Sequence, residues 1–120
     1  MRKVFICSPF RASEPEEQKK NIKVARRICR KALQEGLVPI APHLFFPQFL
    51  SDGDEKEREL GIHAGLVMLE SADEVWVVGN RVSEGMAREI AKAGELGIPT
   101  KCVMDPFVAD EHLLTVLGKE

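Results

Sequence analysis

The stretch EVWVV at residues 74–78 decides the fold of this chain. Its four consecutive apolar residues lack the polar alternation of a strand that has one face in water. A run of this kind is typical of a parallel strand that helices cover on both faces. Parallel strands need long crossover connections, usually helices, so the stretch indicates an α/β protein.

Strand and helix patterns alternate on both sides of this stretch. Further strands are predicted at residues 4–7, 37–41 and 100–104, and helices between residues 13 and 36, at 55–71, at 84–96 and near 110–117. The chain therefore predicts a small flavodoxin-like or Rossmann-like α/β domain that spans residues 1–120. Its core is expected to be an open, doubly wound parallel sheet of four to five strands.

Local signals set the expected helix ends. Ser13-Glu14-Pro15-Glu16 has the spacing of a capping box, with Ser13 as the N-cap of the first helix and Glu16 at its third position. Gly36 is placed to end that helix in the left-handed conformation. Ser83 is expected to cap the helix at residues 84–96.

The helix predicted at residues 55–71 has apolar side chains on two faces. Leu60, Ala64 and Val67 lie on one face, and Ile62, Leu66 and Leu69 lie on another. A helix of this kind is either deeply buried or shared with a partner subunit. In so small a chain we favour the partner, and we expect a homodimer or a higher homo-oligomer.

Composition narrows the functional classes. A net charge of −2 offers no basic surface for polymeric nucleic acid, and no apolar run reaches the length of a membrane span. No signal peptide is apparent, and Cys7, Cys29 and Cys102 have no metal-type spacing. We therefore expect a cytoplasmic protein with reduced core thiols, without a metal or a cofactor and without a membrane partner.

The expected sheet places three loops at its ligand-binding edge. In doubly wound folds ligands bind at the carboxyl ends of the strands. Residues 8–13, 42–54 and 79–85 follow three of the predicted strands. The carboxylates around Asp52 look like a solvated acidic tip of the second of these loops.

The strongest local signal is SEGMAREI at residues 83–90. On a helix, Glu89 lies beside the core-facing stripe and leans back over Gly85, four residues earlier. Because Gly85 has no side chain, a hole is expected above the Glu89 carboxylate, at a helix start that favours an anion. One interpretation makes Glu89 a nucleophile or base that faces a ligand, with Ser83 helping to bind it. The other gives Gly85 a role in close packing and Glu89 a salt bridge at the core edge.

Two other loops offer candidate ligands. Ser8 and Arg11 follow the first strand and, with Ser83, could hold a phosphate monoester. Alternatively they only stabilise a turn, with Arg11 paired to a nearby carboxylate. His43 follows the second strand. It is a candidate for a general acid or for a contact to a base, and the alternative is a residue that orders the loop. Phe45 and Phe46 beside it could stack on a base.

Several segments together resemble a known family. SPFR after the first strand, PIAPHLFFPQFL, ADEVWVVG, SEGMAREI and GIP resemble a bacterial and phage branch of the nucleoside 2-deoxyribosyltransferase-like superfamily, beside the nucleoside 5′-monophosphate N-glycosidases. The likeness runs over nearly the whole chain. It implies a flavodoxin-like fold, often a dimer with sites near the subunit interface, Glu89 as the catalytic carboxylate and Gly85 four residues before it. In the nucleotide-cleaving branch it implies phosphate contacts from Ser83, and similar roles for Ser8 and Arg11.

One departure from that pattern concerns the second long helix. The resembling enzymes carry an aspartate there, eight residues before the position of Asp73, and this chain has Gly65. Three hypotheses therefore stand. The first is an N-glycosidase or deoxyribosyltransferase-like enzyme acting on a nucleoside or its 5′-monophosphate. The second is a non-catalytic nucleotide-binding or regulatory module, and the third is a structural partner protein.

Overall fold

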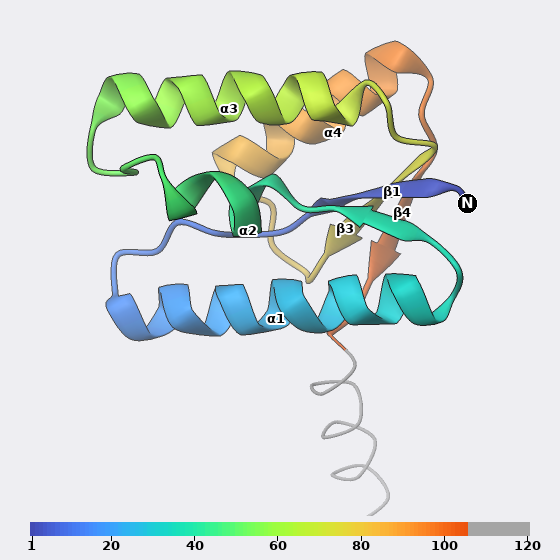
Figure 1. Ribbon diagram of the computed structural model, residues 1–120, viewed down its shortest axis with the longest axis horizontal. Helices are drawn as coiled ribbons and strands as arrows, with labels where there is room; N and C mark the ends of the chain where they lie inside the picture. Colours follow the sequence, from blue (N-terminus) through green and yellow to red (C-terminus); the bar gives the residue numbers. More distant parts are fainter. Residues whose placement is uncertain (106–120) are drawn as a thin grey trace, which may run out of the picture.

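The computed structural model describes residues 1–105, and the helix expected near Asp110–Leu117 lies outside the described residues. The elements in chain order are β1 (Lys3–Cys7), α1 (Pro15–Gln34), β2 (Val38–Ile40), α2 (Pro42–Phe45), the 3-10 helix η1 (Phe46–Gln48), α3 (Glu55–Leu69), β3 (Glu74–Val78), α4 (Glu84–Leu96) and β4 (Thr100–Val103). Strands and helices alternate along the described chain, as the sequence predicts (Figure 1).

The four strands form one parallel sheet in the order β2-β1-β3-β4. Register pairs Phe5 with Ile40 on one side and with Val75 on the other, so β1 and β3 are central. The reversal of strand order between β1 and β3 is the topological switch point of a doubly wound sheet, where ligands bind. The predicted α/β class and the parallel sheet are confirmed.

Helices cover both faces of the sheet, with α1 on one side and α3 and α4 on the other (Figure 1). The α1 side buries Val4, Ile6 and Trp76 against Ile28 and Ala32. The opposite face buries the alternate strand residues, which pack against side chains of α3 and α4: Phe5, Cys7, Val75, Val77, Leu69, Met86 and Ala93. Both faces of EVWVV are therefore dry, which explains its unbroken apolar run.

Two helix starts illustrate where local signals hold and fail. Ser83 caps α4 as predicted, because its hydroxyl accepts a hydrogen bond from the Met86 N–H at 3.2 Å. The capping box predicted at Ser13 is wrong. Glu14 occupies the N-cap position and provides no side-chain cap. Pro15 has the fixed φ that suits the first helical position, so the helix begins one residue later than the capping box requires.

Other predicted boundaries need smaller corrections. Gly36 has a φ of +82° just after α1, as the left-handed ending requires. The connection after β2 contains the short helices α2 and η1.

Of the cysteines, Cys7 is buried, Cys29 is partly buried and Cys102 is exposed, so the expectation of three core thiols fails at Cys102.

Helix α3 has one inward and one outward apolar face. Leu69 is buried in the core, whereas Leu60 and Val67 are 60% and 64% exposed. The two-faced pattern read from the sequence is thus present, and its outer face is uncovered in the single chain. Within residues 1–105, no helix combines the length and the apolar character needed to cross a bilayer.

Candidate active site

A cavity of about 380 Å³ opens at the carboxyl edge of the sheet. This volume lies within the range of small-molecule sites. Its walls come from the loop after β1, from the segment that holds α2 and η1, from α3, and from the first turns of α4. The three loops selected from the sequence therefore meet at one hollow, beside the switch point between β1 and β3.

Glu89 lines this cavity from α4. The residue is 7% exposed, and its Oε1 atom is buried without a hydrogen-bond partner among the described residues. A buried carboxylate oxygen left unpaired costs free energy, and most native structures avoid it. Such an exception at the wall of a cavity is typical of a group that meets its partner in a ligand.

Gly85 lies one turn before Glu89 and also lines the cavity. A Cβ atom built on Gly85 would find nothing within 4 Å. The alternative in which Gly85 permits close packing is therefore wrong, and the missing side chain leaves open space. Ser83 and Glu84 complete this wall at the start of α4.

His43 approaches the same carboxylate from α2. Its Nε2 atom lies 3.5 Å from Oε2 of Glu89. The imidazole stacks on Phe10, with ring centroids 5.7 Å apart and planes 10° from parallel. Phe10 comes from the SPFR loop and was not singled out in the sequence, although it stands between two residues that were. The stack fixes the plane of the imidazole beside the carboxylate.

Cys7 ends β1 and lies near Glu89. Burial and, after it, the nearby carboxylate of Glu89 raise the pKa of the Cys7 thiol far above its usual range. The thiol donates a long hydrogen bond of 3.7 Å to the carbonyl of Met86. Cys7 is therefore an inert, protonated neighbour of Glu89. No sequence signal marked this contact, because it depends on the packing of α4 on β1.

The cavity has a second charged region away from Glu89. Arg11 Nε lies 3.4 Å from Asp52 Oδ2, and Arg58 Nε lies 3.9 Å from Asp52 Oδ1. Asp52 is thus shared by two guanidinium groups, and it is wrong to describe it as part of a solvated tip. Ser8, which is 2% exposed, also lines the cavity.

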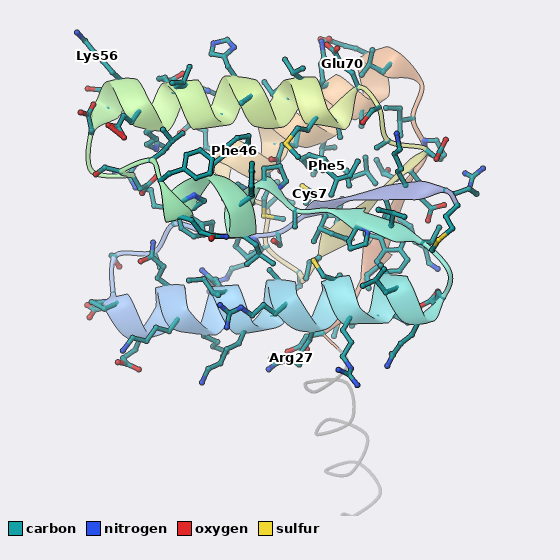
Figure 2. All side chains as sticks on the ribbon, in the orientation of Figure 1. Phe5, Cys7, Arg27, Phe46, Lys56 and Glu70 are labelled. Carbon is teal, nitrogen blue, oxygen red and sulfur yellow. The ribbon has the colours of Figure 1, made fainter. Side chains whose placement is uncertain are left out.

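The two phenylalanines expected near a base have different positions. Phe46 lines the cavity, and Figure 2 shows its side chain between the α2–η1 segment and α3. Phe45 is 52% exposed and does not line the cavity. It packs at the surface against Phe46 and Phe49, with centroid distances of 5.2 and 5.1 Å.

Gly61 and Gly65 form a small-residue stripe where α3 faces α2 and η1. A Cβ on Gly65 would lie 3.5 Å from Pro42 Cβ, and one on Gly61 would lie 3.4 Å from Leu50 Cδ1. Both distances are ordinary van der Waals contacts, so a methyl group would fit at either glycine. Gly65 itself brings no carboxylate to this wall of the cavity. Within residues 1–105, no three His, Cys, Asp or Glu side chains are grouped to hold a metal ion.

Comparison with solved structures defines the class of fold. The chain is similar to the 2-deoxyribosyltransferase from Bacillus psychrosaccharolyticus, with a TM-score of 0.62, 22% sequence identity, and coverage of 85% of this chain and 72% of that one. It is also similar to the 2-deoxyribosyltransferase from Leishmania mexicana, with a TM-score of 0.52, 17% identity, and coverage of 87% of this chain and 65% of that one. The protein thus has a deoxyribosyltransferase-like α/β fold and spans less than two thirds of the Leishmania chain.

Residues 2–103 match the family model DUF7768, described as a domain of unknown function, and the chain belongs to that family. No curated protein matches its sequence.

Proposed function

We propose that this protein is an N-glycosidase or a deoxyribosyltransferase-like enzyme that acts on a nucleoside or a nucleoside 5′-monophosphate. The observation that carries the proposal is the buried Glu89 carboxylate, whose Oε1 atom has no partner among the described residues and which lies at the wall of a ligand-sized cavity. The fold shared with two 2-deoxyribosyltransferases supports the substrate class.

Glu89 has the chemistry of a carboxylate nucleophile. One of its oxygens attacks C1′ of the sugar, the C1′–N bond breaks, and its electron pair goes to the departing base together with a proton. A glycosyl ester of Glu89 forms. Water then attacks C1′, one of its protons is released, and the carboxylate is regenerated; a second base in place of water would give transfer instead of hydrolysis.

His43 is our candidate for the general acid. Gly65 supplies no carboxylate to the cavity, whereas His43 also lines the cavity and lies 3.5 Å from Glu89. An imidazole is able to give a proton to a leaving base and to take one from the incoming water. Ser8, Arg11 and Ser83 are proposed to hold the 5′ end of the substrate, and Phe46, with Phe10 and His43, to contact the base.

The test is incubation of the protein with a panel of nucleosides and 5′-monophosphates, with free base measured by chromatography. Base release that disappears in Glu89→Gln supports the enzyme. Glu59→Gln is the matched control, because Glu59 pairs with Arg88 and does not line the cavity. If no substrate releases its base at high protein concentration, the catalytic proposal fails.

A second candidate is a nucleotide-binding module without turnover. Gly65 favours it, because the carboxylate that the resemblance implies at this wall is missing. In that case nucleosides or nucleotides raise the melting temperature without release of base, and Glu89→Gln leaves that rise unchanged.

We also propose that the protein is a cytoplasmic homodimer that buries the outer face of α3. Leu60 and Val67 are exposed there in the single chain. Light scattering gives the mass in solution. A Leu60→Glu, Val67→Glu variant that stays dimeric would contradict this interface.

A further inference from the structure

We propose that Asp52 determines specificity at the 5′ end of the ligand, by pairing with both arginines of the cavity so that the cavity favours an uncharged 5′-hydroxyl over a 5′-phosphate. The inference rests on the proposed function and narrows its substrate class. It starts from the two ion pairs that Asp52 makes with Arg11 and Arg58.

The geometry of these pairs indicates shared neutralisation. A single carboxylate faces two guanidinium groups that come from different segments, the β1–α1 loop and α3. Both contacts are longer than a charge-assisted hydrogen bond, so neither arginine is held in a bidentate pair. Asp52 cancels one of the two positive charges and draws both heads toward itself.

Besides Asp52, Arg11 and Arg58, the other charged side chains that line the cavity are carboxylates. Glu57, Glu84 and Glu89 line it together with Asp52, so two arginines and four carboxylates give a formal net charge of −2, before any proton on His43 is counted. Glu57 accepts a hydrogen bond from the Ser51 N–H at 2.9 Å, which keeps it at this wall. A phosphate monoester carries up to two negative charges, and like charges brought together in a partly desolvated site repel strongly.

A neutral nucleoside meets no such repulsion. The hydroxyls of Ser8 and Ser83 and the guanidinium donors of Arg11 suit the oxygen atoms of a sugar. With Asp52 removed, both guanidinium groups would lose their shared partner and become available to the ligand, and three carboxylates instead of four would line the cavity, which suits phosphate better. The structure thus assigns the choice between the two ligand classes to one side chain.

The experiment measures binding by calorimetry in a Glu89→Gln background, which suppresses turnover and still leaves three carboxylates in the cavity against two arginines. The probes are deoxyadenosine, deoxyguanosine, deoxycytidine and thymidine, each beside its own 5′-monophosphate. With Asp52 intact, at least one nucleoside is expected to bind about tenfold or more tightly than its monophosphate. Added salt is expected to reduce this ratio, because it screens repulsion.

Asp52→Asn is expected to bring the ratio close to one or to reverse it, through tighter binding of the monophosphate. Glu59→Gln removes one negative charge from the same helix as Arg58, outside the cavity, and is expected to leave the ratio unchanged. Arg58→Gln is a second variant, and it is expected to increase the preference for the nucleoside.

A monophosphate that binds more tightly than its nucleoside with Asp52 intact overturns the inference and leaves the proposed function standing. An unchanged ratio in a folded Asp52→Asn protein also overturns the inference and leaves the proposed function standing. Absence of binding by every probe overturns the proposed function itself, and the inference with it.

Discussion

His43 Nε2 lies 3.5 Å from Glu89 Oε2, although the two residues come from different helices, α2 and α4. Glu89 is almost fully buried, and its other oxygen has no hydrogen-bond partner among the described residues. A titratable group and a buried carboxylate thus converge on one space, with Gly85 leaving that space open. This arrangement stores a cost in the folded protein that a ligand is able to relieve.

That cost gives a prediction for Glu89→Gln. The amide has nearly the same shape and carries no charge, so the free energy of unfolding is expected to rise by about 1 kcal/mol. Base release is expected to fall by roughly a thousandfold, because the amide is not a nucleophile. Urea denaturation and chromatographic assay measure the two effects. A variant that is both less stable and fully active would rule out Glu89 as a nucleophile.

Gly85→Ala is expected to separate stability from function. A Cβ there meets nothing within 4 Å, so the gain in helix propensity should raise the free energy of unfolding by up to about 1 kcal/mol. The added methyl occupies the space above Glu89, and ligand affinity and base release are expected to fall about tenfold. Melting curves and initial rates measure both.

Gly94→Ala is the matched control for this prediction. Gly94 lies on the same helix, its Cβ would also meet nothing within 4 Å, and it does not line the cavity. It should stabilise the protein without changing activity. Equal losses of activity in the two variants would contradict a binding space at Gly85.

The proposed role of His43 predicts a dependence on the leaving group. His43→Gln is expected to reduce base release from ordinary nucleosides about a hundredfold, because the base must then leave without a proton. A nucleoside of 7-methylguanine already carries a positive charge on its base, so its cleavage should lose far less. His63→Gln, an exposed change on α3 outside the cavity, is the control. Equal losses on both substrates would exclude His43 as the acid.

The raised pKa of the Cys7 thiol predicts that the folded protein becomes less stable at alkaline pH. Its pKa is raised in the folded protein, first by burial and then by Glu89, so the folded state keeps this proton above the ordinary thiol value of 9.0. The stabilisation is complete below pH 9 and is lost as pH rises above it, because the unfolded chain then ionises freely. Cys29, whose pKa burial also raises, adds to the same trend.

The measurement is urea denaturation at pH 8 and pH 10. The free energy of unfolding is expected to be lower at pH 10 by on the order of 1 kcal/mol per buried thiol, and Cys7→Ala should lose less between the two values. In the native protein, Cys102 should react with a thiol reagent much faster than Cys7, because Cys102 is exposed. Identical pH profiles with and without the Cys7 thiol would count against a buried thiol beside Glu89.

The sequence by itself determined the layers of this fold. The unbroken EVWVV run required cover on both faces, and the alternation of strands and helices required a parallel sheet. Local chemistry also placed the Ser83 cap and the position of Gly85 one turn before Glu89, because both depend only on residues about one helical turn apart.

Tertiary structure alone decided which distant side chains meet. The contacts of His43 with Glu89 and Phe10, of Cys7 with Glu89, and of Asp52 with two arginines join segments from different strands and helices. The same packing left Phe45 outside the cavity and brought Phe10 inside. Sequence periodicity fixes which face of an element is buried, but the distance between two faces depends on how side chains of all the elements fill the space between them.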